Sequence, residues 1–442
     1  MERADVVLVY PQRAPRRGRH WIMPSLGLMY LAASLRRAGY TVRHLDHTFL
    51  ERREVLAEIE RLKPSVIGVY CMITMQDEAF SLAEEVRGKA LTVVGGPYPS
   101  GEAEPFLDRF DLVAVGEGEE TIVEIMEHLG DRRFEEVPGL VFRRGGEVVR
   151  TPPRPRSRDL SHLPLPDRGD LPHRQYIDYW RRHWKRATTP LMSTRGCPFR
   201  CEFCHKSVFG DLFGARPAES VVQEMEEIAG LGYDHVWMSD DIFTLNYRRT
   251  LELCRRIEEA RLPLTWECLS RVTQVDLELF TQMRRAGCTR VFFGIESGDE
   301  TVLKRMRKGI TPDQARQAVE ACVEAGIEAA GFFMVGYLGE TQRSLERTIR
   351  FSSRLPLSYV SYTIAYPLPG TRFYDQVQER RAHGEWQRVR HNRLLFNTDF
   401  SERKLRFAIL KGAVQHRLRR SRLRPLAAAF ELATDPVLRV LR

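Results

Sequence analysis

Three cysteines lie close together near the middle of the chain, and their spacing could support metal chemistry. Cys197, Cys201 and Cys204 are spaced C-x3-C-x2-C in the run Ser-Thr-Arg-Gly-Cys-Pro-Phe-Arg-Cys-Glu-Phe-Cys-His. Three thiolates from one tight loop can bind three irons of a [4Fe-4S] cluster, which leaves the fourth iron open to a small molecule. Gly196 and Pro198 allow the loop to turn sharply around the metal. The spacing therefore predicts an iron-sulfur site with an open position.

Two other interpretations of the cysteines stay open on spacing alone. Zinc could bind here if His205 or a distant residue completed a four-ligand site. The three thiols could also bind no metal. A zinc site would suit a zinc-stabilised nucleic-acid-binding protein, because the chain is basic and nucleic acids attract positive charge. The metal found after anaerobic purification would distinguish the two classes.

The composition of the chain is that of an ordinary globular protein. It has 442 residues, of which 43% are apolar, and this is enough for two or three domains with their own cores. Apart from the three above, its cysteines stand singly in apolar segments, which favours buried thiols over a disulfide framework. The N-terminus shows no leader pattern, and no apolar run reaches about 18 residues. We therefore expect a cytoplasmic protein.

The net charge of +9 is unevenly distributed along the chain. Nine basic residues and no acidic one lie between Arg403 and Arg424, and the apolar run 425–430 follows. Such a segment is typical of a basic amphipathic helix on an anionic membrane or partner, and equally of a solvated helical cover. Peripheral membrane contact through this basic region is therefore one expectation. We expect no nucleic-acid partner.

The first third of the chain alternates strand-like apolar runs with helix-like stretches. The strand-like runs are 6–10, 41–46, 66–70, 91–94 and 112–115. Continuous apolar strands separated by helices indicate a parallel sheet that is covered on both faces. Residues 140–151, with Gly-Gly at the tip, predict a hairpin. We therefore predict an α/β domain with a doubly wound parallel sheet at residues 1–150. A linker rich in Pro and Arg should follow at residues 151–188.

A second alternation of strands and helices begins near Pro190. Its strand-like runs are 191–194, 235–239, 265–268, 290–295, 328–335 and 359–365. Six strand-helix units predict a partial (β/α)6 barrel of the TIM type at residues 189–375. The cysteine loop would follow the first strand, at the carboxyl ends of the strands, where such barrels bind ligands. Residues 376–442 should form a short, basic, helical C-terminal region.

The cysteine loop resembles the cluster-binding loop of the radical S-adenosylmethionine (radical SAM) superfamily, C-x3-C-x-aromatic-C, with Phe203 as the aromatic residue. The resemblance implies a [4Fe-4S] cluster on Cys197, Cys201 and Cys204, whose open iron is chelated by S-adenosyl-L-methionine. An electron, supplied by an external donor such as flavodoxin or ferredoxin, would then yield a 5′-deoxyadenosyl radical. The protein's task would be to orient the reactants and to exclude side reactions.

Further segments resemble the radical SAM motifs in their order along the barrel. These segments are Trp237–Thr244, Cys268–Arg271, Phe293–Gly298, Gly331–Glu340 and Tyr366–Thr371. The resemblance places Asp240 and Asp241 near the ammonium group of S-adenosylmethionine, and Arg271 near its carboxylate. It implies that Glu296 accepts hydrogen bonds from the ribose hydroxyls and that the turn at Gly336 contacts the adenine. Any one of these residues could instead serve the scaffold, for example as a helix cap. The ordered series is the specific signal.

The first domain resembles the cobalamin-binding domain that precedes the barrel in one large radical SAM class. The segments that carry the resemblance are residues 91–101 and 111–119. It implies that cobalamin is contacted by Thr74, Gly95, Gly96, Pro97 and Gly116. Glycines would let the backbone approach the flat macrocycle, where a Cβ would collide. A Gly-Gly pair after a strand is common in α/β turns, so this signal is weak by itself.

The sequence lacks the pattern D-x-H-x-x-G, whose histidine binds cobalt in cobalamin-dependent mutases. His20 has no Asp two residues before it, and we expect His44 and His47 to face solvent or to cap helices. Side chains of the loop 70–75 would then meet the lower face of cobalamin without a histidine ligand. This arrangement is usual in the radical SAM class concerned. It favours a strongly nucleophilic cobalt that takes a methyl group.

Together the motifs predict a cobalamin-binding (B12-dependent) radical SAM enzyme that resembles the class B methyltransferases. It would transfer a methyl group to an unactivated carbon or phosphorus of a small-molecule substrate. The run Cys204–Gly210 also looks like the loop of the anaerobic magnesium-protoporphyrin monomethyl ester cyclase group, so radical oxidation or cyclisation without methyl transfer is the alternative. A tRNA methylthiotransferase would need a second cluster, and the first domain offers only Cys71. No residue stands out as a catalytic acid, base or radical relay.

Overall fold

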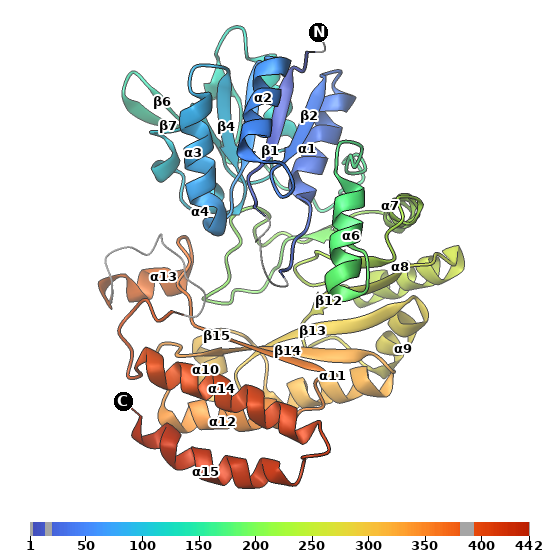
Figure 1. Cartoon of the computed structure of the whole chain (residues 1–442), viewed down its shortest axis with the longest axis vertical. Helices are drawn as coiled ribbons and strands as arrows, with labels where there is room; N and C mark the ends of the chain where they lie inside the picture. Colours follow the sequence, from blue (N-terminus) through green and yellow to red (C-terminus); the bar gives the residue numbers. More distant parts are fainter. Residues whose placement is uncertain (1–2, 14–19, 381–392, 442) are drawn as a thin grey trace. The chain divides into compact units, whose positions relative to one another are not determined.

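The computed structural model of the chain describes residues 3–13, 20–380 and 393–441 (Figure 1). It divides into two compact units. The first comprises Met1–Pro198 and Lys206–Trp237, and the second comprises Phe199–His205 and Met238–Arg442. The cysteine loop therefore contributes to both units, with Cys197 in the first and the other two cysteines in the second. The predicted domain boundaries at residues 150, 188 and 375 describe sequence patterns rather than packing, and they stay a prediction.

A seven-stranded sheet forms the centre of the first unit, in the order β2-β1-β3-β4-β5-β6-β7. Its strands are β1 Val6–Tyr10, β2 Val42–Asp46, β3 Val66–Tyr70, β4 Leu91–Gly95, β5 Leu112–Ala114, β6 Leu140–Arg144 and β7 Glu147–Arg150. Strands β1 to β5 are parallel, whereas β5, β6 and β7 pair antiparallel. The doubly wound sheet and the hairpin predicted from the sequence are confirmed.

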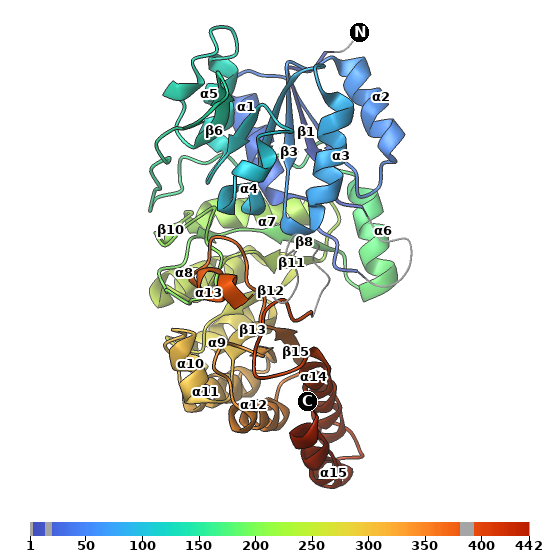
Figure 2. The same ribbon diagram turned by 90° about the vertical axis from the view of Figure 1, so that its left-hand side faces the viewer.

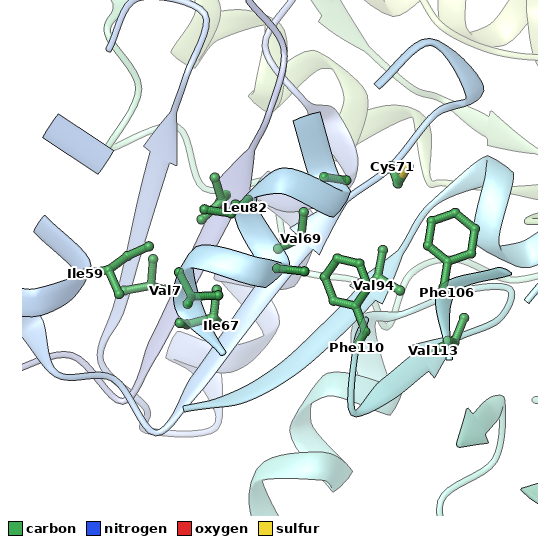
Figure 3. Close-up of a cluster of buried hydrophobic side chains, with 14 of the residues drawn as sticks. Val7, Ile59, Ile67, Val69, Cys71, Leu82, Val94, Phe106, Phe110 and Val113 are labelled. Carbon is green, nitrogen blue, oxygen red and sulfur yellow. The ribbon is translucent and has the colours of Figure 1, made fainter. Parts of the chain in front are cut away.

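Helices cover both faces of this sheet. They are α1 Leu26–Arg37, α2 Arg52–Leu62, α3 Gln76–Val86, α4 Pro97–Gly101 and α5 Glu119–Glu127, and the unit also contains α6 His173–Trp184 and α7 Ala218–Gly230. One core cluster joins Val7 and Ile67 of the sheet to Ile59 of α2 and Leu82 of α3 (Figure 3). The opposite cluster contains Val6 and neighbours from α1 and α5. Adjacent residues of β1 are thus buried on opposite faces, which explains its continuous apolar sequence.

A second sheet contains six strands in the order β15-β14-β13-β12-β11-β8. They are β8 Thr188–Leu191, β11 His235–Met238, β12 Thr265–Ser270, β13 Cys288–Glu296, β14 Glu328–Val335 and β15 Tyr359–Ile364. Strands β12 to β15 pair in parallel. The first strand, β8, ends at Leu191, whereas the sequence predicted that it would run from 191 to 194. Residues Thr194–Arg195 instead form the short strand β9, which pairs antiparallel with β10 Gly214–Ala215. The partial barrel is otherwise confirmed.

The remaining helices belong to the second unit. They are α8 Tyr247–Ala260, α9 Leu277–Arg285, α10 Glu300–Arg305, α11 Pro312–Glu324, α12 Gln342–Arg354, α13 Arg372–Val377, α14 Glu402–Arg419 and α15 Leu426–Val440. Thr311 caps α11 through the backbone of Gln314, and Pro312 takes the first helical position, where no amide donor is needed. Strands end before α14, so the helical C-terminal region is confirmed over 402–440.

Part of the segment predicted as a linker is a packed helix. In α6, Trp180 is buried and donates from Nε1 to the carbonyl of Ile22 at 2.9 Å. Tyr176, one turn earlier, is also buried and donates to Asp46 at 2.6 Å. These two aromatic residues are four positions apart, so they lie on one helical face.

No helix within the described ranges is long and apolar enough to cross a bilayer.

Candidate active site

The start of the cysteine loop is fixed within the first unit. Gly196 has a φ of +80°, and a Cβ at this position would overlap the carbonyl oxygen of Leu212, so only glycine fits. The amide of Cys197 donates to the carbonyl of Gly210 at 3.2 Å. Lys206 Nζ donates to the Cys197 carbonyl at 2.8 Å. The backbone of the first cysteine is therefore held before any metal binds.

Arg195, two residues before the first cysteine, forms a buried ion-pair network. Its guanidinium contacts Glu117 at 2.5 Å and also pairs with Glu119. It lies 5.0 Å from the ring centroid of Tyr30 and 4.9 Å from that of Phe209. Burial alone would lower the pKa of Arg195, but the two carboxylates outweigh it and raise this pKa above its usual value. The network joins the start of the loop to the segment that follows β5.

The residues predicted to contact cobalamin lie along one edge of the first sheet. Thr74 follows β3, Gly95 ends β4 and Gly116 follows β5. Because these strands are parallel and adjacent, their carboxyl ends meet at the same edge. Gly96 and Pro97 continue directly from β4 into α4. The structure thus gathers all five predicted residues on the edge where open α/β sheets bind ligands.

The glycines of this edge are required for different reasons. Gly96 has a φ of +114°, and a Cβ there would lie 2.8 Å from the carbonyl oxygen of Cys71, so the fold itself demands glycine. At Gly95, the nearest atom to a Cβ would be Ala114 Cβ at 3.6 Å, which is an ordinary contact. The fold therefore has space for a methyl group at Gly95, and packing alone does not explain this glycine. This space fits the approach of a flat macrocycle.

The segment that follows the cysteine loop reaches the same edge. Ser207, three residues after the last cysteine, donates its hydroxyl to the carbonyl of Pro97 at 2.9 Å. The carbonyl of Val208 lies 3.8 Å from the position that a Cβ on Gly116 would take. Both contacts are internal to the first unit. Residues 207 and 208, which follow the cysteine loop, therefore contact the predicted cobalamin edge.

His44 in β2 and His47, which follows this strand, are buried, which corrects the expectation that they face solvent or cap helices. His44 is 5% exposed and His47 4% exposed. Burial lowers the pKa of both, that of His47 to about 4, because the charged imidazolium loses its hydration. Neither ring nitrogen of His44 has a hydrogen-bond partner among the described residues. These histidines are neutral core residues in or just after a strand remote in sheet order from β4 and β5.

The second half of the cysteine loop is fixed within the second unit by Glu202. Its amide donates to the carbonyl of Met306 at 3.0 Å, and its carbonyl accepts from the amide of Phe373 at 2.9 Å. The buried carboxylate pairs with Arg307 at 2.7 Å and accepts from Gln376 at 3.0 Å. Glu202 stands between Cys201 and the predicted aromatic residue of the motif. It therefore positions the part of the loop that carries the second and third cysteines.

Arg271 places a buried positive charge beside the second cysteine. Its guanidinium carbon lies 3.7 Å from the ring centroid of Phe199, and its Nη1 lies 3.7 Å from Cys201 Sγ. Its Nη2 donates to the carbonyl of Lys308. Metal-bound sulfur is anionic, and a guanidinium at this distance would offset part of its charge. The donor set and its charged neighbour therefore fit an iron-sulfur cluster.

Glu296, predicted to accept from ribose hydroxyls, already has a cationic neighbour. It forms a buried ion pair with Lys308 at 2.9 Å. A Cβ on Gly294 would lie 2.8 Å from atoms of both partners, so glycine makes room for the pair. Glu296 has a φ of +67°, a conformation that non-glycine residues adopt rarely and that often marks functional sites. Lys308 Nζ also lies 5.8 Å from the ring centroid of Phe203.

The turn after β14 contains a buried carboxyl group. Gly336, predicted to line the adenine, donates its amide to Glu340 at 2.6 Å. Burial raises the pKa of Glu340 to about 8, so this side chain is neutral near pH 7. A Cβ on Gly336 would lie 2.5 Å from Leu405, so packing already explains this glycine. The turn is thus built by internal contacts, and its contact with adenine stays a prediction.

The two predicted acids after β11 differ in environment. Asp240 is fully buried, whereas Asp241 is exposed. Within the described part of the chain, no three His, Cys, Asp or Glu side chains are gathered around the position of a single metal ion. A [4Fe-4S] cluster does not need three ligands around one metal ion, because each cysteine binds a different iron.

Sequence reasoning missed Arg195, Glu202 and Lys308. The first two lie inside the cysteine run itself, where a charged residue flanked by Cys or Gly was a readable signal. Lys308 carried no such signal, because it lies in a loop between α10 and α11 and meets Glu296 only through the fold.

Two family models match this chain. The B12 binding domain matches residues 19–126, and the Radical SAM superfamily matches residues 191–352. The chain is also 32% identical over 366 residues to an uncharacterised methyltransferase of Pyrococcus horikoshii, covering 80% of this chain and 78% of that protein. The chain belongs to the cobalamin-binding radical SAM family. Family membership makes it a radical SAM enzyme and overturns the zinc-stabilised nucleic-acid-binding alternative.

This chain is also similar in sequence or in fold to other proteins of this kind. The anaerobic magnesium-protoporphyrin IX monomethyl ester cyclase of Cereibacter sphaeroides is 29% identical over 377 residues, covering 81% of this chain and 61% of the cyclase. The solved structure of TsrM, a radical SAM methyltransferase from Kitasatospora setae with cobalamin and a [4Fe-4S] cluster bound, has a TM-score of 0.72 at 22% identity, covering 86% of this chain and 75% of TsrM. It shares the fold. The two matching domains imply a [4Fe-4S] cluster, S-adenosylmethionine and cobalamin as the cofactors of this chain.

Proposed function

We propose that this enzyme transfers a methyl group to an unactivated carbon or phosphorus of a small-molecule substrate. The observation that carries the proposal is the contact of Ser207 with Pro97, which brings the end of the cluster loop to the glycine edge of the first sheet. On that edge, packing alone does not explain the glycine at position 95. The segment that leaves the cysteine loop thus packs against the edge where we place the methyl carrier.

The cysteine loop and its neighbours would bind the cluster and S-adenosylmethionine. Cys197, Cys201 and Cys204 would ligate three irons, and Arg271 would offset the negative charge of the sulfurs and meet the methionine carboxylate. Asp240 or Asp241 would accept from the ammonium group. Glu296 would accept from ribose hydroxyls with the oxygen that Lys308 does not contact, while Phe203 and Gly336 would lie along the nucleoside.

The glycine edge of the first unit would hold cobalamin through its backbone. Gly95, Gly96, Pro97 and Gly116 would approach the macrocycle, with Thr74 and the rest of the loop 70–75 beneath it. When bound, the cluster supplies an electron that cleaves S-adenosylmethionine to a 5′-deoxyadenosyl radical, and cobalamin supplies a methyl group. An external donor such as flavodoxin or ferredoxin would provide the electrons. The chain itself orients the reactants and excludes water.

Radical oxidation or ring closure without methyl transfer is the second candidate. The 29% identity to the porphyrin ester cyclase favours it. The two candidates differ in one product. Methyl transfer through cobalamin consumes the methyl group of one S-adenosylmethionine and releases S-adenosylhomocysteine, whereas radical oxidation does not.

The products of S-adenosylmethionine turnover test the proposal. Anaerobic enzyme loaded with cluster and cobalamin is reduced and mixed with S-adenosylmethionine, and both products are quantified by mass spectrometry. We expect S-adenosylhomocysteine beside 5′-deoxyadenosine. In Gly95→Val, S-adenosylhomocysteine should fall sharply while 5′-deoxyadenosine persists, because the new side chain occupies the space left for the macrocycle. Gly130→Val is the matched control, since Gly130 has nothing within 4 Å of its Cβ position. Formation of 5′-deoxyadenosine alone by the wild type would contradict methyl transfer.

A further inference from the structure

Helix α15 presents most of its apolar side chains to the outside, and only Ala427 and Leu438 are buried. Leu432 and Val440 are 75% and 76% exposed. The other exposed apolar residues of the helix and the turn before it are Leu423, Leu426, Ala428, Ala429, Ala433, Pro436 and Val437. A surface helix normally buries its apolar stripe and exposes its charges. In α15 this relation is reversed.

The acidic residues of α15 face the second unit instead. Glu431 contacts Arg350 at 2.7 Å and Arg419 at 2.8 Å. Asp435 pairs with Lys411, whose side chain is 2% exposed, and with Arg350 at 3.3 Å. Burial alone would raise the pKa of Glu431, but the hydrogen bond and the charge of Arg350 lower it. Rolling the helix to bury Leu432 would break these pairs and leave Lys411 buried without its partner, so the orientation is fixed.

Positive charge lies next to the N-terminal end of the apolar stripe. Between residues 403 and 430 the sequence contains no acidic residue. The exposed basic residues at the end of α14 and in the turn are Arg417, Arg420, Arg422 and Arg424. Figures 1 and 2 show α14 lying against α12 and α15, so α15 forms the outer layer of this part of the second unit. The exposed arginines and the exposed apolar stripe are therefore neighbours along the chain, at the turn where α15 begins.

We propose that α15 and the α14–α15 turn bind the surface of an anionic lipid bilayer. Leu432, Val440 and their apolar neighbours would enter the boundary between headgroups and acyl chains, and the arginines would meet lipid phosphates. The helix would lie in the plane of the surface, because its 15 residues are fewer than the roughly 20 that a span needs. This inference does not depend on the proposed methyl transfer.

Charge decides against two other occupants of this surface. A second copy of the chain would meet it through a two-fold axis and bring two sets of arginines together, which is unfavourable. A nucleic acid would satisfy the arginines but would leave the apolar stripe without a partner. An anionic bilayer complements both features at once.

Sedimentation of the full-length protein with vesicles tests the proposal. We expect binding to vesicles of phosphatidylcholine and phosphatidylglycerol, weaker binding to phosphatidylcholine alone, and loss of affinity as salt is raised. The double variant Arg422→Gln/Arg424→Gln should bind roughly 25-fold more weakly, at about fivefold for each arginine. The double variant Leu432→Ser/Val440→Ser should lose at least about tenfold in affinity, because two apolar side chains no longer insert.

The controls separate binding from folding. Both pairs of residues are exposed, so each variant should keep the circular dichroism spectrum and thermal midpoint of the wild type. Val323→Ser, which changes an exposed aliphatic residue of α11, should bind like the wild type. The proposal is overturned if the wild type does not sediment with anionic vesicles. It is equally overturned if the Leu432→Ser/Val440→Ser variant binds these vesicles as tightly as the wild type. It is also overturned if vesicle-free protein is a dimer that this variant dissociates.

Discussion

The two predicted cofactor-binding regions use different chemistry. At the edge of the first sheet, most of the predicted contacts are glycine backbone positions, and packing alone does not explain Gly95. At the strand ends of the second unit, they are buried charged side chains such as Arg271 and Glu296. A wide macrocycle needs room, whereas the charged groups of S-adenosylmethionine need partners of opposite sign. If the predicted residues bind these cofactors, each region would match the size and charge of its own ligand.

Removal of one charge from the second region should have the largest effect on stability. Glu296→Gln leaves the ammonium group of Lys308 buried without a counter-charge, and we expect a loss of about 4 kcal/mol in unfolding free energy. The double variant Glu296→Gln/Lys308→Met should recover most of it, because no charge is then stranded. Calorimetry of the cofactor-free protein measures both. Equal losses in the single and double variants would show that the ion pair is not the cause.

A smaller effect should appear as a pH dependence carried by Glu340. Burial raises the pKa of Glu340 from 4.5 to about 8, so the folded protein holds a proton that the unfolded chain releases between these values. Stability should therefore fall as pH rises from about 4.5 to 8, by about 3.5 kcal/mol between pH 5 and pH 8, and should level off outside that window. Glu340→Gln cannot ionise and should lose this part of the fall. Thermal midpoints at pH 5 and pH 8 test it, and identical pH profiles for variant and wild type would refute it.

The smallest changes in stability should come from the glycine edge. Gly96→Ala forces a side chain into a φ of +114° beside Cys71 and should cost about 2 kcal/mol. Gly95→Ala should stay within about 0.5 kcal/mol of the wild type, because its Cβ has room. If a macrocycle uses that room, Gly95→Ala should nevertheless weaken cobalamin binding about tenfold. Unchanged cobalamin affinity in Gly95→Ala, measured by equilibrium dialysis, would remove Gly95 from the site.

The sequence predicted the strands and the order of the motifs more successfully than the contacts between charged residues. Apolar runs located both sheets because a parallel strand buried on two faces must be continuously apolar. The runs could not show that His44 is buried, since one polar residue within a strand is equally compatible with exposure. The first barrel strand was placed too late because Pro190 was read as its boundary, whereas β8 includes this residue. The partner of Glu296 comes from a loop 12 residues later, and only the fold brings it there.

The central claim is that three cysteines of one loop, held by different contacts in each unit, bind a cluster with one open iron. Electron paramagnetic resonance of the reduced, iron-reconstituted protein, before and after addition of S-adenosylmethionine, tests this claim most directly. We predict a [4Fe-4S] signal that changes when S-adenosylmethionine is added, and that disappears in Cys201→Ala but persists in Cys322→Ala, where a buried cysteine of α11 is changed. A cluster signal that survives in Cys201→Ala, or that S-adenosylmethionine leaves unaltered, would contradict the account.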